Sequence, residues 1–172
     1  MVKYMKKDNI FFPFAFAFIN CFYKYTISES SKMEIKQRTL VILKPEVLEQ
    51  NIIGNVMSFF DKLKIVPIAM KIHKPTMDEI VEHYYDVLQK VSSETAEDII
   101  QRMTRGSCIF IVYEDVDVIK KVRDLIGSTE PEKANKGTIR KTFGNTIRYN
   151  VAHGSDSVES AEKEIKLWFS EL

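Results

Sequence analysis

The chain has 172 residues, enough for one domain with a sizeable buried core. Its formal net charge of +1 argues against a protein built to hold nucleic acid by bulk electrostatics. The two cysteines make neither a disulfide framework nor a metal cluster, so a reducing compartment is expected. The three histidines, His73, His83 and His153, are not closely spaced, which argues against a metal site built from protein ligands.

Residues 1–32 differ in composition from the rest of the chain. Lysines, then a phenylalanine-rich apolar run, then Ala15-x-Ala17 follow the outline of a secretory signal. The apolar run is short and interrupted for a transmembrane helix. Alternatively, translation starts at Met33 and the upstream residues are an extension of the gene model. We therefore divide the chain into an N-terminal extension, residues 1–32, and a domain, residues 33–172, which is slightly acidic by itself.

The first predicted elements alternate between strand and helix. Residues 39–43 are a β-branched run typical of a buried strand, and Pro45 closes it. A helix should follow, and residues 65–72 form a second predicted strand. The helix should turn inward the apolar side chains of Ile52, Val56, Phe59, Phe60 and Leu63.

Two helical segments then precede the third strand. We predict a helix from Thr76 to about residue 88 and another over about 93–103. Residues 108–113 form the third predicted strand. A helix over 117–126 should be stopped by Gly127.

The remaining chain is a long irregular stretch, a strand and a helix. Residues 128–149 are rich in Gly, Pro, Asn and Lys, and a loop of that length is usually functional. A short strand is expected near 147–151. Asp156 with Glu159 resembles a capping box, which places the helix start at about Ser157. Apolar side chains should share one face of that helix, namely Val158, Ala161, Ile165, Trp168 and Leu172.

This order of elements predicts an α+β fold. It fits the β-α-β-β-α-β order of a ferredoxin-like, four-stranded antiparallel sheet, with helices packed on one face.

The most informative stretch is the polar turn around His153. Gly154, Ser155 and Asp156 follow the histidine, and a helix begins directly after them. Small residues let a ligand come close, and a positive helix end beside hydroxyl groups suits a bound phosphate.

The segment Asn150-x-x-His153-Gly154-Ser155-Asp156 resembles the signature of nucleoside diphosphate kinases. In that family the histidine carries a phosphoryl group between nucleotides. The resemblance extends from Arg38 to Phe169 and includes further matching positions, namely Lys44, Tyr84, Arg123, Thr129, Arg140, Ile147 and Glu164.

The resemblance implies a ping-pong reaction through a phosphohistidine at His153. Glu164 would orient the imidazole, and Tyr84 would reach its neighbourhood. Asn150 would bind the sugar hydroxyl, and Ile147 would lie on one face of the base. The implied phosphate ligands are Lys44, Arg123, Thr129 and Arg140. Mg²⁺ should arrive with the nucleotide, with no metal site of the protein's own.

Without the resemblance, several of these residues have plainer interpretations. Arg123 and Lys44 would be solvated surface charges, Tyr84 a residue at the edge of the core, and Glu164 part of an exposed helix face. We interpret Cys108, His73 and His83 as structural.

The sequence departs from the family where the base should bind. The family has a Pro-Phe-Phe segment after its His-Tyr pair, and the first phenylalanine stacks on the base. Here residues 91–97 are about three residues longer by alignment and contain no aromatic side chain. The loss of this stacking phenylalanine should weaken base binding by about 1 kcal/mol or more. After Arg140, Lys141-Thr142 replace the family's Gly-Asp.

The expected partners are nucleoside di- and triphosphates, with a homo-oligomer, tetramer or hexamer, as the expected assembly. The domain should need neither nucleic acid nor a membrane. A start at Met33 would imply a cytoplasmic enzyme, whereas a cleaved signal would imply an organellar or secreted one. The rival interpretation is a binding or regulatory protein that kept the fold and barely turns over.

Overall fold

The computed structural model describes residues 35–172. The expectations for residues 1–32, and for a domain that begins at residue 33, lie outside the described residues.

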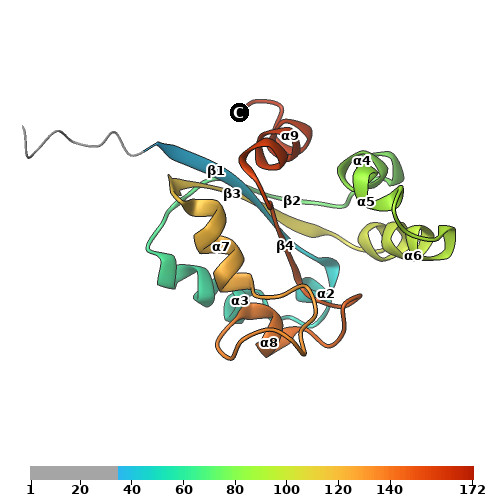
Figure 1. The fold of residues 1–172 in the computed structure, drawn as a ribbon, viewed down its shortest axis with the longest axis horizontal. Coiled ribbons are helices and arrows are strands. Elements are labelled where there is room, and N and C mark those ends of the chain that lie inside the picture. The colour runs from blue at the N-terminus through green and yellow to red at the C-terminus, as the bar shows by residue number, and fades with distance from the viewer. Residues whose placement is uncertain (1–34) are drawn as a thin grey trace, which may run out of the picture. The chain divides into compact units, whose positions relative to one another are not determined.

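Four antiparallel strands form one sheet in the spatial order β2-β3-β1-β4 (Figure 1). They are β1 (Lys36–Leu43), β2 (Pro67–His73), β3 (Cys108–Val116) and β4 (Ala152–Gly154). The first three lie within a few residues of the predicted strands. The end of β1 runs beside β4, and Ile42 is paired with His153.

Helices connect these strands and lie mainly where the apolar pattern predicts them. They are α2 (Pro45–Glu49), α3 (Ile53–Phe60), the 3₁₀ turn η1 (Asp61–Leu63), α4 (Met77–His83), α5 (Tyr85–Leu88), α6 (Ser93–Thr104), α7 (Val118–Ile126), α8 (Ile139–Phe143) and α9 (Val158–Trp168). The expected ferredoxin-like α+β fold is confirmed. From Ile35 onward, no helix combines the length and apolarity that crossing a membrane requires.

Both faces of the sheet are covered by helices. Val41 and Leu43 of β1 belong to a core cluster with residues of α3 and α7, whereas Leu40 and Ile42 belong to a cluster with residues of α4, α6 and α9. Figure 1 shows these two groups of helices on opposite sides of the sheet. The expectation of helices on one face is wrong, because β1 is buried at consecutive positions instead of alternating between core and solvent.

The helix boundaries near the site are set by local chemistry. Thr76 caps α4 as expected, through a reciprocal pair of hydrogen bonds with Glu79. The single helix predicted for 76–88 is instead divided at Tyr84 into α4 and α5. Gly127 ends α7 as expected, with a φ of 87° that favours glycine.

The irregular stretch before β4 contains a short helix that the sequence pattern missed. Thr138 caps α8, and its hydroxyl accepts a hydrogen bond from the N–H of Lys141. The last strand begins at Ala152, after the predicted range 147–151. The delay has a local cause: Val151 has a φ of 61°, so the chain turns there before it can pair with β1.

The start of α9 differs in detail from the predicted capping box. Ser157, not Asp156, is the capping residue, and its hydroxyl accepts a hydrogen bond from the N–H of Ser160. Ala161, Ile165 and Trp168 are buried as expected, whereas Val158 and Leu172 are exposed at the two ends of the apolar face.

Candidate active site

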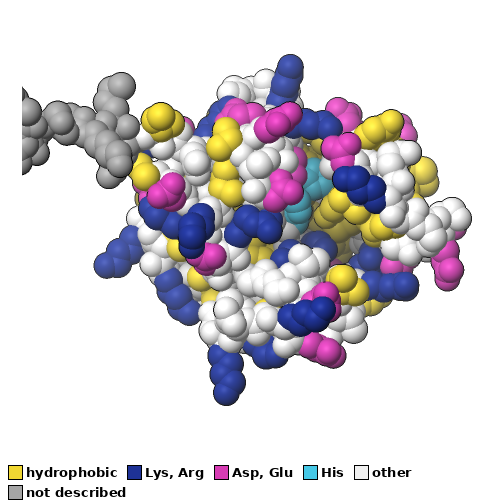
Figure 2. Space-filling view, in the orientation of Figure 1, with side chains coloured by type: hydrophobic (Ala, Val, Ile, Leu, Met, Phe, Trp, Pro, Cys, Tyr) yellow, Lys and Arg dark blue, Asp and Glu magenta, His cyan; other side chains and the backbone are white. Residues whose placement is uncertain are grey.

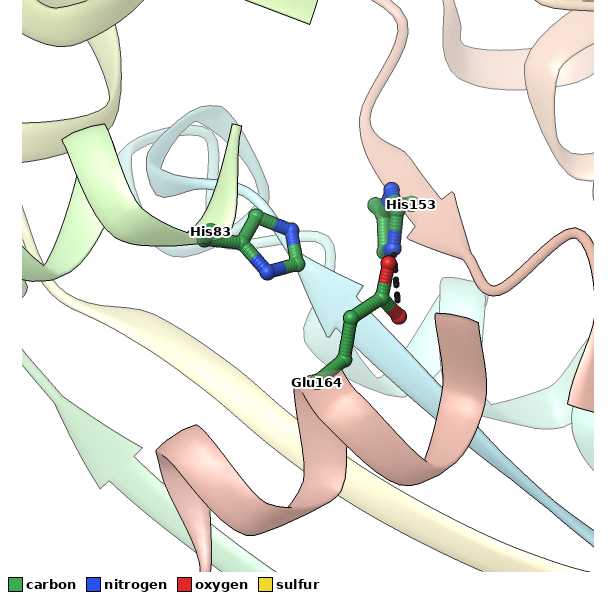
Figure 3. A group of neighbouring side chains, drawn as sticks. All are labelled: His83, His153 and Glu164. Carbon is green, nitrogen blue, oxygen red and sulfur yellow. Dashed lines mark hydrogen bonds and ion pairs between the residues drawn. The ribbon is translucent and has the colours of Figure 1, made fainter. Parts of the chain in front are cut away.

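His153 lies on β4 and pairs with a carboxylate from α9. Its Nε2 atom is 3.2 Å from Oε2 of Glu164 (Figure 3). The hydroxyl of Ser155 donates to the same carboxylate oxygen at 2.6 Å and so fixes the orientation of the carboxylate. Within residues 35–172, no hydrogen bond engages Nδ1 of His153. The ring therefore presents one nitrogen to Glu164 and keeps the other available.

A second histidine, which the sequence led us to treat as structural, lies beside this pair. The rings of His83 and His153 are 4.8 Å apart between centroids and meet edge to face. The indole N–H of Trp168 donates to Nδ1 of His83 at 3.2 Å. Burial, reinforced by His153, lowers the pKa of His83 well below its usual value, so the ring is neutral with its hydrogen on Nε2.

The tautomer of His83 decides whether His83, His153 and Glu164 could together hold a metal ion. Nitrogen and oxygen atoms of His83, His153 and Glu164 lie within 4.8 Å of one another, close enough to suggest a metal site. A metal ligand must be an unprotonated nitrogen, however, and Trp168 leaves His83 with a protonated Nε2 facing the pair. The group does not fit a bound divalent cation.

Next to His153 is a cavity of about 410 Å³. Five predicted site residues line it, namely Lys44, Tyr84, Thr129, Ile147 and Asn150. Neither His153 nor Glu164 lines the cavity itself; Tyr84 connects the two, because its ring centroid is 6.1 Å from that of His153. Figure 2 shows histidine side chains within a hollow that hydrophobic, basic and acidic side chains border.

Asn150 is the centre of a polar network in the cavity wall. Nζ of Lys44 donates to Oδ1 of Asn150 at 2.6 Å. The amide group of Asn150 donates to the carbonyl oxygens of Thr129 and Ile147 at 3.1 and 3.0 Å. These hydrogen bonds hold Lys44, which is far away in sequence, beside Thr129 and Asn150 in the same wall of the cavity.

Two arginines lie in a small recess that adjoins this wall. Arg140 donates to the carbonyl oxygens of Gly127 and Ala152, at 2.8 and 2.7 Å, and lies 3.5 Å from the hydroxyl of Thr129. Arg123, on α7, lines the same recess. Nε of Arg140 is buried and has no hydrogen-bond partner among the described residues.

The positive groups of the site are partly desolvated. Burial lowers the pKa of Lys44 to about 8, with Arg140 and Arg102 lowering it further and Glu46 opposing them. Burial likewise lowers the pKa of Arg140 to about 10. Burial raises the pKa of Tyr84, which keeps its hydroxyl protonated and able to donate. A site that disfavours its own positive charges is complementary to an anionic ligand.

The far wall of the cavity comes from the segment that departs from the family pattern. Val91, just before α6, lines it together with Thr95 and Ile99, which share one face of that helix. Arg102, further along α6, also lines the cavity and donates to Asp98 at 3.1 Å. Sequence reasoning placed residues 91–97 where the base should bind but missed Ile99 and Arg102, although their helical spacing from Thr95 was a signal.

A histidine held by a carboxylate, beside a basic cavity on a ferredoxin-like sheet, defines the class as a phosphotransferase. The family model described as "Nucleoside diphosphate kinase" matches residues 37–172. The chain therefore belongs to the nucleoside diphosphate kinase family.

Individual relatives agree with this assignment. The chain is 37% identical over 136 residues to a nucleoside diphosphate kinase of Clostridium perfringens, covering 79% of this chain and 93% of that protein. It is 38% identical over 137 residues to one of Helicobacter pylori, covering 79% and 97%. The crystal structure of apo nucleoside diphosphate kinase from Encephalitozoon cuniculi superimposes with a TM-score of 0.74 at 32% identity, covering 78% of this chain and 90% of that one. A family protein from Babesia bovis gives 0.72 at 32% identity, covering 78% and 88%.

Proposed function

We propose that this protein is a nucleoside diphosphate kinase whose phosphoryl carrier is His153. It moves the γ-phosphate of a nucleoside triphosphate to a nucleoside diphosphate by the ping-pong mechanism general to the family. The observation that carries the assignment to His153 is its geometry: Nε2 is engaged with Glu164, and Nδ1 is left as a nucleophile beside a basic cavity.

The reaction consists of two mirrored displacements. Nδ1 of His153 attacks the γ-phosphorus, an N–P bond forms, and the P–O bond to the β-phosphate breaks, so the diphosphate leaves. A second diphosphate enters the same site, and its terminal oxygen reverses the step. Glu164 accepts the hydrogen bond from Nε2–H, holds the tautomer and stabilises positive charge on the ring.

The binding residues divide by their position in the cavity. Arg140 and Lys44, whose positive charges are desolvated by burial, suit the charge on the transferring group. The other proposed phosphate ligands are Arg123 and Thr129. Asn150 binds the sugar hydroxyl and Ile147 one face of the base, while Tyr84 donates near His153.

Mg²⁺ belongs to the nucleotide in this scheme. Delivered with the nucleotide, it would neutralise charge on the phosphates. The phosphate side of the site offers lysine and arginine side chains, which fits an ion that the phosphates carry.

The test is to incubate the protein with magnesium and a γ-labelled triphosphate without acceptor. We expect an acid-labile, alkali-stable label that is absent from His153→Ala and released by a different diphosphate. His73→Ala is the matched control, because His73 pairs with Glu79 away from the cavity. An unlabelled wild-type protein would contradict the proposal and favour the rival, a binding or regulatory protein, which the missing aromatic wall motivates.

A homo-oligomer, tetramer or hexamer, is the proposed assembly. Its support is the edge strand β2, where Ile68, Met70 and Ile72 are about half exposed or more, in a row on one face. No nucleic acid or membrane is needed by the domain.

The division of the chain at residue 33 and a cytoplasmic location are proposed together. Mass spectrometry of the native N-terminus tests both. A protein that begins at Met33 supports them, whereas a cleavage site within residues 1–32 would indicate the organellar or secreted alternative.

A further inference from the structure

The chain makes a strained turn two residues before His153. Val151 has a φ of 61°, which is a marked outlier for a β-branched residue. The N–H of Ala152 donates to the carbonyl oxygen of Asn150 at 2.7 Å, so the turn contains only three residues. Strain of this kind persists only where the surroundings hold it in place.

A segment distant in sequence holds the turn from both sides. Oε1 of Glu46 accepts the N–H of Val151 at 3.1 Å, and the N–H of Lys44 donates to the carbonyl oxygen of Val151 at 2.9 Å. Glu46 is only 4% exposed, so water cannot readily replace its carboxylate. NH2 of Arg105 lies 3.6 Å from its other oxygen.

The residues on either side of Val151 have proposed roles in nucleotide binding and catalysis. Asn150 precedes Val151, and Ala152 and His153 follow it; Arg140 donates to the carbonyl oxygen of Ala152. Any rotation at Val151 changes the position of the sugar ligand relative to the nucleophile. Such displacements are costly, because phosphoryl transfer depends on the alignment of the attacking atom.

We propose that Glu46 is a positioning residue for phosphoryl transfer, holding Val151 in its left-handed conformation and so fixing Asn150 and His153 relative to each other. The inference rests on the proposed role of His153. Glu46 itself touches neither the nucleotide nor the reacting atoms.

The test is single-turnover labelling of His153 at saturating triphosphate, with Glu46→Ala, Glu46→Gln and Glu49→Ala. We expect Glu46→Ala to slow labelling about tenfold, because the turn loses its acceptor. Glu46→Gln should recover most of the rate, since its amide oxygen can still accept from Val151. Glu49→Ala is the matched control: it removes the closer partner of Arg105, at 2.7 Å, from the same helix and should stay within about twofold.

Amide hydrogen exchange at Val151 separates this inference from the proposed function. Exchange should be slow in the wild type and in Glu46→Gln, and at least about tenfold faster in Glu46→Ala. If Val151 is protected but the wild-type protein is not labelled, the proposed function is wrong. The contact between Glu46 and Val151 then has no role in catalysis. Fast exchange in Glu46→Ala with an unchanged labelling rate would overturn the inference alone.

A second pair of variants serves if Glu46→Ala does not fold. Val151→Ala and Val151→Gly remove the same buried side chain, but only glycine accepts the left-handed conformation without strain. We expect Val151→Gly to melt above Val151→Ala and to label His153 faster, because glycine keeps the left-handed conformation without strain while alanine must be held in it. Equal or slower labelling by Val151→Gly would contradict the inference.

Discussion

The ammonium group of Lys44 lies in surroundings that disfavour its positive charge. Its pKa of about 8 results first from burial and then from neighbouring arginines, against the opposing influence of Glu46. The neutral form is therefore accessible near physiological pH when the site is empty. A bound phosphate would reverse this effect by pairing with the charge.

This lowered pKa predicts a pH dependence of nucleotide binding. In its proposed role as a phosphate ligand Lys44 acts in its charged form, so affinity of the free enzyme should fall as the pH rises through about 8. Stability has the opposite sign: between about 8 and the usual 10.5 the unfolded chain binds more protons, so this group's contribution rises with pH. Titration calorimetry from pH 6.5 to 9.5 measures the affinity.

The control for this prediction is Lys44→Arg. Arginine remains charged over the whole range, so the inflection near pH 8 should vanish. An identical inflection in the variant would assign the titration to another group.

Val91 is the residue at which base binding can be strengthened. It lines the cavity on the wall that lacks an aromatic side chain. We expect Val91→Phe to tighten nucleoside diphosphate binding by about 1 kcal/mol, by base stacking. Equilibrium binding of a diphosphate measures the change, and inorganic phosphate, which has no base, is the control ligand. A similar gain for phosphate would show that stacking is not the cause.

At the scale of elements, α9 joins the core to the site. Ala161 and Ile165 are buried, whereas Glu164 on the same helix reaches His153. The position of Glu164 depends on where the helix begins, and Ser157 determines that start.

The cap at Ser157 predicts a loss of stability on its removal. Ser157→Ala should cost about 1 kcal/mol, because the N–H of Ser160 loses its acceptor. In a domain of this size the melting temperature should fall by about 2–4 °C. Calorimetry measures the shift, and Glu159→Ala is the control. An equal loss for Glu159→Ala would favour the capping box that the sequence suggests.

At the scale of the whole molecule, the described sheet has two edge strands, β2 and the short β4. The longer of them, β2, carries a row of exposed apolar side chains. Such an edge promotes association with another chain.

The proposed assembly through this edge is testable with Met70→Lys. Met70 is 50% exposed, and a lysine there would have to be desolvated in an interface. Native mass spectrometry should show a shift toward smaller species. Ile35→Lys changes a side chain that is 82% exposed outside this row and should leave the distribution unchanged. An unaltered assembly in Met70→Lys would exclude this edge from the interface.

Much of this molecule could be predicted from the sequence. The uninterrupted apolar run of β1, the glycine after α7 and the threonine before α4 act over a few residues, so local patterns predicted those elements. The resemblance around His153 predicted the family, and its carboxylate partner at Glu164 is 3.2 Å from the ring.

Other features depend on contacts between segments far apart in the chain, and only the tertiary structure decided them. Helices cover both faces of the sheet, because each face of β1 needs its own apolar partners. Burial keeps His83 neutral beside His153, and Trp168, 85 residues away, holds its tautomer. Val151 stays in a strained conformation because Glu46 lies opposite its N–H. Local patterns predict what a segment prefers, whereas these three features are set by what packs against it.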